Sequence, residues 1–109
     1  MIRLFIAGLV LAFSVAAAAA PLPCGGSGTG QTAAAYKADD GTILEACFDR
    51  KAGNVTVRLS GAEAVTLPSA ISGSGARYSN GTLVFWEHQG TGRYFAGEKL
   101  LFEGKPVPS

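Results

Sequence analysis

Short runs of alternating apolar and polar residues, separated by turn signals, fill the chain from about residue 31 onward. The clearest run is 55–59, where Val55, Val57 and Leu59 face one way and the residues between them face the other. Further strands are expected on the same grounds at 32–37, 42–49, 63–67, 76–79, 82–87, 93–96 and 98–103. With no helical period among them, these strands predict an all-β domain. It is either a sandwich or a closed barrel, and closure removes exposed sheet edges.

The inward-facing apolar side chains of these strands form the expected core. Eight strands make a barrel just wide enough to be filled by side chains. The expected interior residues are Leu44, Phe48, Val55, Val57, Leu59, Val65, Leu67, Leu83, Phe85, Leu100 and Phe102. Pro68 is expected to end the fourth strand, because proline cannot donate to a sheet ladder. Residues 104–109, with two prolines, are expected to form a loose tail after a domain at 31–103.

The first 20 residues differ in composition from the rest. Arg3, an apolar stretch at 4–15 and an alanine run at 16–20 are typical of a secretory signal peptide at 1–20. The alternative is an uncleaved anchor, although the apolar stretch is too short to span a bilayer in the usual way. A Gly/Pro-rich arm at 21–30 follows. Lipidation of Cys24 is not expected, because prolines occupy the positions one and three before it, where a lipidation signal needs a small and a leucine-like residue.

Charge and cysteine content narrow the classes of partner. Without the leader, the chain holds eight Lys plus Arg (nine minus Arg3) and eight Asp plus Glu, with no run of either sign. Binding to nucleic acid or to an anionic membrane therefore has no support, and no membrane span is expected. Cys24 and Cys47 are expected to form one disulfide, which stabilises a small exported domain by about 3 kcal/mol. Two cysteines and one histidine are too few for a structural zinc site, and no cofactor or metal is expected.

The stretch 71–90 carries the candidate functional residues. Asn80-Gly81 between two strand-like runs predicts a hairpin with a type I′ turn. Antiparallel pairing then brings a small-residue loop at 72–75 and the polar tip at His88 to the same end of the sheet. The glycines on either side of Ser74 allow a close approach to a partner, although an ordinary connection between strands has the same composition. Trp86 is either an interface anchor or part of the barrel wall, and His88 is either a site residue or a solvated one.

A catalytic function is not expected. Ser74 does not lie in a strand–turn–helix nucleophile elbow, and no helix is present to help form an oxyanion hole. Glycoside hydrolysis needs two carboxylates facing each other in a cleft. Glu87 with Glu98 or Glu103 could be considered, but these are ordinary charges near strand ends.

The residues 72–78, Ser-Gly-Ser-Gly-Ala-Arg-Tyr, are followed by Asn80-Gly81 and by Val-Phe-Trp at 84–86. This pattern resembles the periplasmic and membrane-bound inhibitors of c-type lysozyme in Gram-negative bacteria. Upstream, Tyr36, Asp-Gly-Thr at 40–42 and Leu44 resemble the opening hairpin of that family. The resemblance implies an eight-stranded antiparallel barrel. It also implies a periplasmic, non-enzymatic inhibitor, a monomer or weak dimer, that enters the active-site cleft of a c-type lysozyme and protects peptidoglycan.

The family's motif serine, which meets the catalytic carboxylates of lysozyme, corresponds to Ser74. The family's lysine just after the tryptophan falls on His88, or on Gln89 if the following glycine is kept aligned. The expected contact residues are Ser74, His88, Gly73, Gly75, Arg77, Tyr78 and Gln89. The family's early cysteine falls on Ala38, and its C-terminal cysteine is absent. These departures leave an alternative, an inhibitor-like barrel that binds another envelope ligand and no longer inhibits lysozyme.

Overall fold

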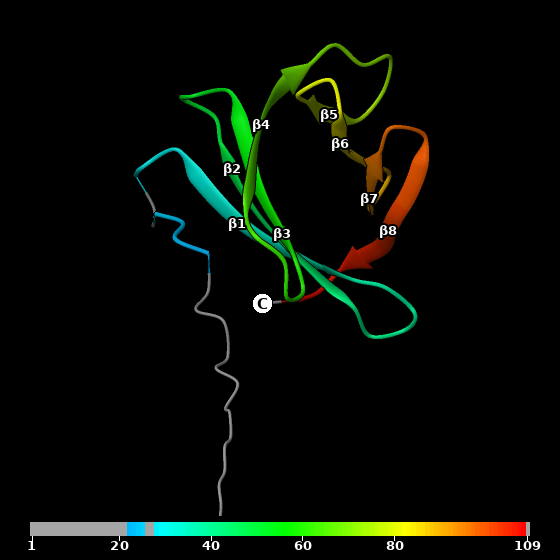
Figure 1. Ribbon diagram of the computed structural model, residues 1–109. Helices are drawn as coiled ribbons and strands as arrows, with labels where there is room; N and C mark the ends of the chain where they lie inside the picture. Colours follow the sequence, from blue (N-terminus) through cyan, green and yellow to red (C-terminus); the bar gives the residue numbers. More distant parts are fainter. Residues whose placement is uncertain (1–21, 26–27, 109) are drawn as a thin grey trace, which may run out of the picture.

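The computed structural model describes residues 22–25 and 28–108. The signal peptide expected at 1–20 lies outside them. The described chain forms eight antiparallel strands that close into a barrel in sequence order (Figure 1). The strands are β1 (Gln31–Lys37), β2 (Ile43–Asp49), β3 (Asn54–Leu59), β4 (Val65–Ala70), β5 (Ala76–Ser79), β6 (Leu83–His88), β7 (Thr91–Ala96) and β8 (Lys99–Pro106). The expected all-β fold and the eight-stranded barrel are confirmed.

Pairing of β8 with β1 closes the barrel. Pro106 lies opposite Tyr36, Lys105 lies opposite Lys37, and the Val107 N–H donates to the Ala35 carbonyl at 2.8 Å. The expectation of a loose tail from residue 104 is therefore wrong for 104–106, which belong to β8. Without this segment, the backbone groups at the end of β1 would lack partners.

Pro68 lies inside β4, so the expected strand end at this proline is also wrong. The Ser69 N–H donates to the Gly53 carbonyl at 2.9 Å, which places Pro68 opposite Asn54 at a position where the β3–β4 ladder uses no N–H. On the other side, β5 pairs only with Ser69 and Ala70. The missing donor is therefore not needed on either side of the strand.

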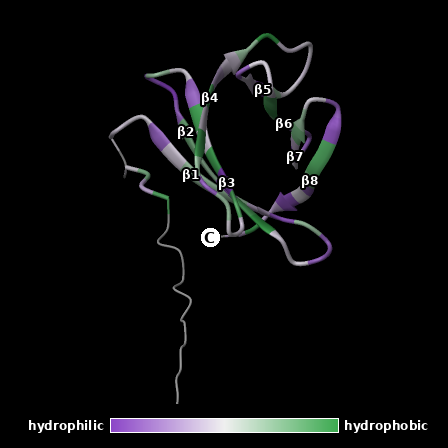
Figure 2. Ribbon diagram, in the orientation of Figure 1, coloured by the Kyte–Doolittle hydropathy of each residue, from purple (hydrophilic) through white to green (hydrophobic). Residues whose placement is uncertain are grey.

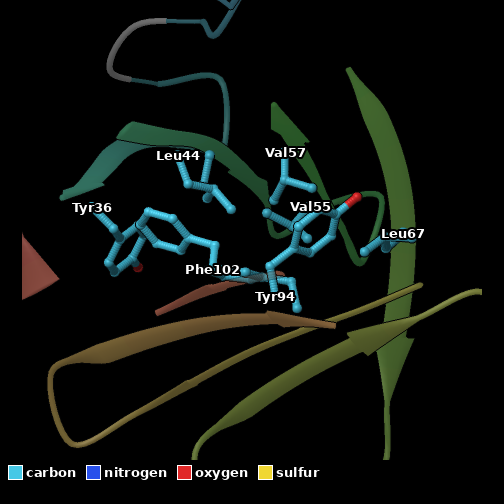
Figure 3. Close-up of a cluster of buried hydrophobic side chains, with 9 residues drawn as sticks. Tyr36, Leu44, Val55, Val57, Leu67, Tyr94 and Phe102 are labelled. Carbon is cyan, nitrogen blue, oxygen red and sulfur yellow. The ribbon is translucent and has the colours of Figure 1, made fainter. Parts of the chain in front are cut away.

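The core is a cluster of buried side chains contributed from all around the barrel (Figure 3). Its members are Tyr36, Leu44, Ala46, Val55, Val57, Leu67, Phe85, Tyr94 and Phe102. Four other expected interior residues are partly buried against it, namely Phe48, Leu59, Val65 and Leu83. The interior prediction missed the two tyrosines, because alternation is weak in their strands and each carries a polar hydroxyl.

Leu100 is 46% exposed, so its expected place in the interior is wrong. Figure 2 shows β8 with a hydrophobic middle between hydrophilic ends. Because the apolar residues in this middle are consecutive, hydrophobic periodicity does not show which of them face the barrel interior. Tyr94 pairs with Phe102 but Phe95 pairs with Leu100, so Leu101 is an extra residue in β8. A bulge of this kind reverses the alternation, and Leu100 faces outward with Phe95.

The N-terminal arm is fastened to β2 by the expected disulfide. Cys24 and Cys47 are joined, with their Cα atoms 5.7 Å apart. Next to the bond, the Gly25 N–H donates to the Gln31 side-chain oxygen at 2.5 Å, and the Arg50 N–H donates to the Gly30 carbonyl at 3.0 Å. The disulfide prediction is confirmed. Over the part of the chain described, the structure contains no helix of a length and apolar character that could cross a bilayer.

Candidate functional site

The β5–β6 hairpin forms in the expected place but with a different turn. Ala76 pairs with Glu87 and Ser79 with Val84. Of the two residues expected to form a type I′ turn, only Gly81 has a positive φ, so that turn type is wrong. Instead the Asn80 side-chain oxygen accepts hydrogen bonds from the Thr82 N–H at 2.9 Å and from the Leu83 N–H at 2.8 Å. Asparagine commonly organises a turn through its side chain in this way.

The Ser72–Gly75 loop, which we call the Ser74 loop, protrudes at the other end of this hairpin. Ser74 is exposed, and its carbonyl accepts hydrogen bonds from the Ser72 hydroxyl and from the Trp86 indole N–H, the latter at 2.9 Å. Both donors hold the loop backbone rather than the Ser74 side chain. The Ser74 hydroxyl therefore projects from an anchored backbone.

Gly75 brings the Ser74 loop directly against the end of β6. Its φ is +71°, and a Cβ there would lie 2.4 Å from the Glu87 carbonyl oxygen and 2.9 Å from the His88 Cβ. Only glycine fits both the backbone conformation and the space. The structure thus brings the Ser74 loop and His88 together, as the hairpin argument expects.

His88 is the last residue of β6, not a tip beyond it, and it pairs with Thr91. Its imidazole stacks on the Trp86 indole, with ring centroids 5.7 Å apart and planes 14° apart. The connection that follows is Gln89-Gly90, where both residues have positive φ (53° and 76°). This is the type I′ pattern that sequence reasoning placed at Asn80-Gly81.

β7 begins directly after this tight turn. Thr91 and Gly92, which come before the strand expected at 93–96, are its first two residues. Because the turn has only two residues, Gln89 is exposed at its apex, while the half-buried His88 lies within the sheet.

Arg77 and Tyr78 face opposite sides of the barrel wall. The Tyr78 ring packs 5.8 Å from Phe48, and burial together with the negative charge of Glu87 raises the pKa of the Tyr78 hydroxyl. Arg77 is therefore on the outer side, opposite Trp86 in the β5–β6 ladder. The structure places Arg77 beside the stacked pair of Trp86 and His88, and it does not place Tyr78 on that surface.

The charges around the site differ in how they are paired. Arg93, which pairs with Trp86 across the β6–β7 ladder, donates to the Glu103 carboxylate at 2.8 Å. Arg77 has no carboxylate partner in the described part of the chain. On the inner side, burial raises the pKa of Tyr36 to about 12, and the negative charge of Glu87 contributes to the shift. The outer surface thus offers Arg77 as a cation that an acidic partner could bind.

The site is a protrusion and not a cleft. A groove of about 270 Å³ lies between the N-terminal arm and strands β1 and β2. Leu22, Ala33 and Ala35 are among the residues that line it, and it does not include the Ser74 loop. Among residues 22–25 and 28–108, no group of three or more His, Cys, Asp or Glu side chains could hold a metal ion. The arrangement can present a hydroxyl, an imidazole and a guanidinium to a partner that has a cleft of its own.

Sequence reasoning missed one exposed residue of this end of the barrel, Ile71, directly before the Ser74 loop. It left the role of Trp86 open, and the structure shows the indole anchoring the loop at the barrel surface. An apolar residue next to a turn, outside any alternating run, was the signal available for Ile71.

A comparison with protein families places the chain among known proteins. The sequence model of the family described as membrane-bound lysozyme-inhibitor of c-type lysozyme matches residues 36–99. The match runs from the end of β1 to the start of β8 and includes the whole β5–β6 hairpin. No curated protein and no solved structure was found to match the chain.

Proposed function

The chain belongs to the family of membrane-bound inhibitors of c-type lysozyme, and we propose that it inhibits such an enzyme by inserting the Ser74 loop and His88 into the active-site cleft. The resemblance drawn from residues 72–78 is thereby confirmed. The observation that carries the proposal is the exposed Ser74, on a loop anchored by Trp86 and lying against His88. We propose that the chain acts by binding alone and has no catalytic activity.

The chemistry of the lysozyme cleft suits these groups. A c-type lysozyme cleaves its substrate with one protonated acid and one ionised carboxylate. The Ser74 hydroxyl can donate to the carboxylate and accept from the acid. The His88 imidazole can donate a further hydrogen bond to a carboxylate in the cleft. Because hydrogen bonds to the Ser74 carbonyl already order the loop, less conformational entropy is lost on binding.

Of the two candidates for the family's lysine position, we propose His88. Its Cβ lies next to Gly75 in the Ser74 loop, and its ring is held by the stack on Trp86. Gln89 carries no charge and sits one residue further, at the apex of the turn. His88→Lys is then expected to strengthen inhibition, whereas Gln89→Lys is expected to change it less.

The test is a cell-wall lysis assay with a c-type lysozyme and the purified mature protein. We expect inhibition in the nanomolar to micromolar range and a loss of about tenfold or more for Ser74→Ala, because a hydrogen bond to a charged group is removed. Thr82→Ala removes an exposed hydroxyl at the opposite end of the same hairpin and serves as the matched control. A folded wild-type protein that does not inhibit would contradict the proposal and favour an envelope-binding barrel.

We further propose that the mature protein is a periplasmic protein without a lipid anchor. The Cys24 sulfur is bonded to Cys47, and one sulfur atom cannot also carry a lipid thioether. Mass spectrometry of the protein purified from its host is expected to show a mass that increases by two hydrogens on reduction. An acylated Cys24 would contradict this proposal without affecting the proposal about inhibition.

A further inference from the structure

Ile71 is the most exposed large apolar residue in the described part of the chain. It is 95% exposed, whereas Leu100, Leu101 and Val107 lie between 38% and 46%. A single exposed apolar residue on a protein surface needs no explanation by itself. The position of Ile71 is what distinguishes it, because it connects β4 to the Ser74 loop.

The residues on both sides of Ile71 are held in place. Ala70 before it pairs with Arg77 in the β4–β5 ladder. The hydroxyl of Ser72, the next residue, donates to the Ser74 carbonyl and accepts from the Ser74 N–H. The backbone of Ile71 is therefore fixed by its neighbours, although its side chain contributes almost no buried surface to the barrel.

We propose that Ile71 is an apolar anchor of the inhibitor, which packs against the apolar lining of the lysozyme cleft beside the point that Ser74 reaches. This inference rests on the proposed function. The catalytic acid of a c-type lysozyme lies in a hydrophobic pocket against a tryptophan, so apolar surface is present next to the carboxylates. Two residues lie between Ile71 and Ser74, so their Cα atoms are at most about 11 Å apart. An anchor that starts almost fully exposed removes the most apolar surface from water when it is buried.

Specificity follows from the same contact. The hydroxyl and the imidazole recognise carboxylates that any retaining glycosidase could offer. An isoleucine close to the Ser74 hydroxyl also requires an apolar surface at the rim of the cleft. Ile71 would therefore help to select lysozymes with such a rim.

The experiment compares inhibition constants of the wild type, Ile71→Ala and Leu100→Ala, with Ser74→Ala measured alongside. Leu100 is exposed in the β7–β8 hairpin, at the end of the barrel away from His88, and is the matched control. Ile71→Ala is expected to raise the inhibition constant about tenfold, mainly through faster dissociation, and Leu100→Ala less than about twofold. Ile71 is almost fully exposed and Leu100 is about half exposed, so thermal unfolding of Ile71→Ala should match that of the wild type and that of Leu100→Ala should change little.

The outcomes separate this inference from the proposed function. If the wild type inhibits and Ser74→Ala weakens it, but Ile71→Ala does not, the anchor is wrong and the proposed function stands. If Leu100→Ala weakens inhibition as much as Ile71→Ala, the effect is not specific to this end of the barrel and the anchor is again wrong. If the wild type does not inhibit, both proposals fail.

Discussion

Gly75 is the position at which the site is most sensitive to one added carbon atom. Its φ of +71° is a conformation that side chains with a Cβ rarely adopt, and the added Cβ would lie 2.4 Å from the Glu87 carbonyl oxygen. Gly75→Ala must therefore strain the loop backbone and push the Ser74 loop away from the end of β6. That movement separates Ser74 from His88, the two groups that we propose enter the lysozyme cleft.

Two contributions set the size of the effect on the free energy of unfolding. Placing alanine in the left-handed region costs about 1–2 kcal/mol. Forcing a carbon into occupied space costs about 1–3 kcal/mol more, because backbone atoms of Glu87 and His88 have to move. The expected loss is about 2–5 kcal/mol, which a domain of typical stability survives at room temperature.

Two other glycines separate these contributions. Gly81 has a φ of +95° and open space around it, so Gly81→Ala should show the backbone cost alone. Gly73 lies in the same loop as Gly75 with open space and no positive φ, so Gly73→Ala should change stability by less than about 0.5 kcal/mol. Urea unfolding followed by tryptophan fluorescence measures all three, because Trp86 is the only tryptophan and bonds to the Ser74 loop.

The inhibition assay then tests the link to function. Gly75→Ala is expected to weaken inhibition far more than Gly81→Ala, because only the former displaces the Ser74 loop. If the two variants had equal stability, the close approach of Gly75 to β6 would be refuted. If Gly75→Ala inhibited as well as the wild type, the need for Ser74 and His88 to lie together would be refuted.

Three further predictions follow from the same geometry. The pKa of Tyr36 in the folded protein is about 12, above the ordinary value of 10, so its contribution to the free energy of unfolding is complete below pH 10 and is lost as the pH rises through 12. In urea unfolding, Tyr36→Phe should reduce this alkaline loss of stability by about 2 kcal/mol. Equal stability curves for the two proteins would contradict the assignment. His88→Ala should weaken inhibition, because it removes the imidazole that stacks on Trp86 next to Gly75; an unchanged inhibition constant for this variant would count against a role for the imidazole. Reduction of the Cys24–Cys47 disulfide, which spans a sequence separation of 23, should lower the free energy of unfolding by about 3 kcal/mol; a reduced protein of unchanged stability would show that the arm is ordered by other contacts.

The candidate site was predictable to the extent that it depends on local pattern. A hairpin between strands at 76–79 and 82–87 was enough to bring Ser74 and His88 to one end of the sheet, because antiparallel pairing leaves no other arrangement. The side of the wall taken by each residue was harder to predict. Tyr78 was expected at the contact surface, but its ring packs against Phe48 from a distant strand. For a residue of intermediate polarity such as tyrosine, the side of the barrel wall that it faces depends on packing partners in other strands, which the sequence of its own strand does not show.

The sequence alone determined the features that depend on neighbouring residues and on counts. The alternation of apolar and polar residues over short runs predicted the strands. Two cysteines in an exported chain allow a single disulfide within the chain, which the structure contains. The tertiary structure decided the features that depend on distant residues. The pairing of β8 with β1 drew Gly104–Pro106 into the barrel, because the edge of β1 needed hydrogen-bonding partners. The register shift between β7 and β8 turned Leu100 outward, and alternation along β8 alone does not reveal it. The contact of Gly75 with Glu87 and His88 likewise exists only once β5 and β6 are paired in register, because the pairing of Ala76 with Glu87 places Gly75 next to the end of β6.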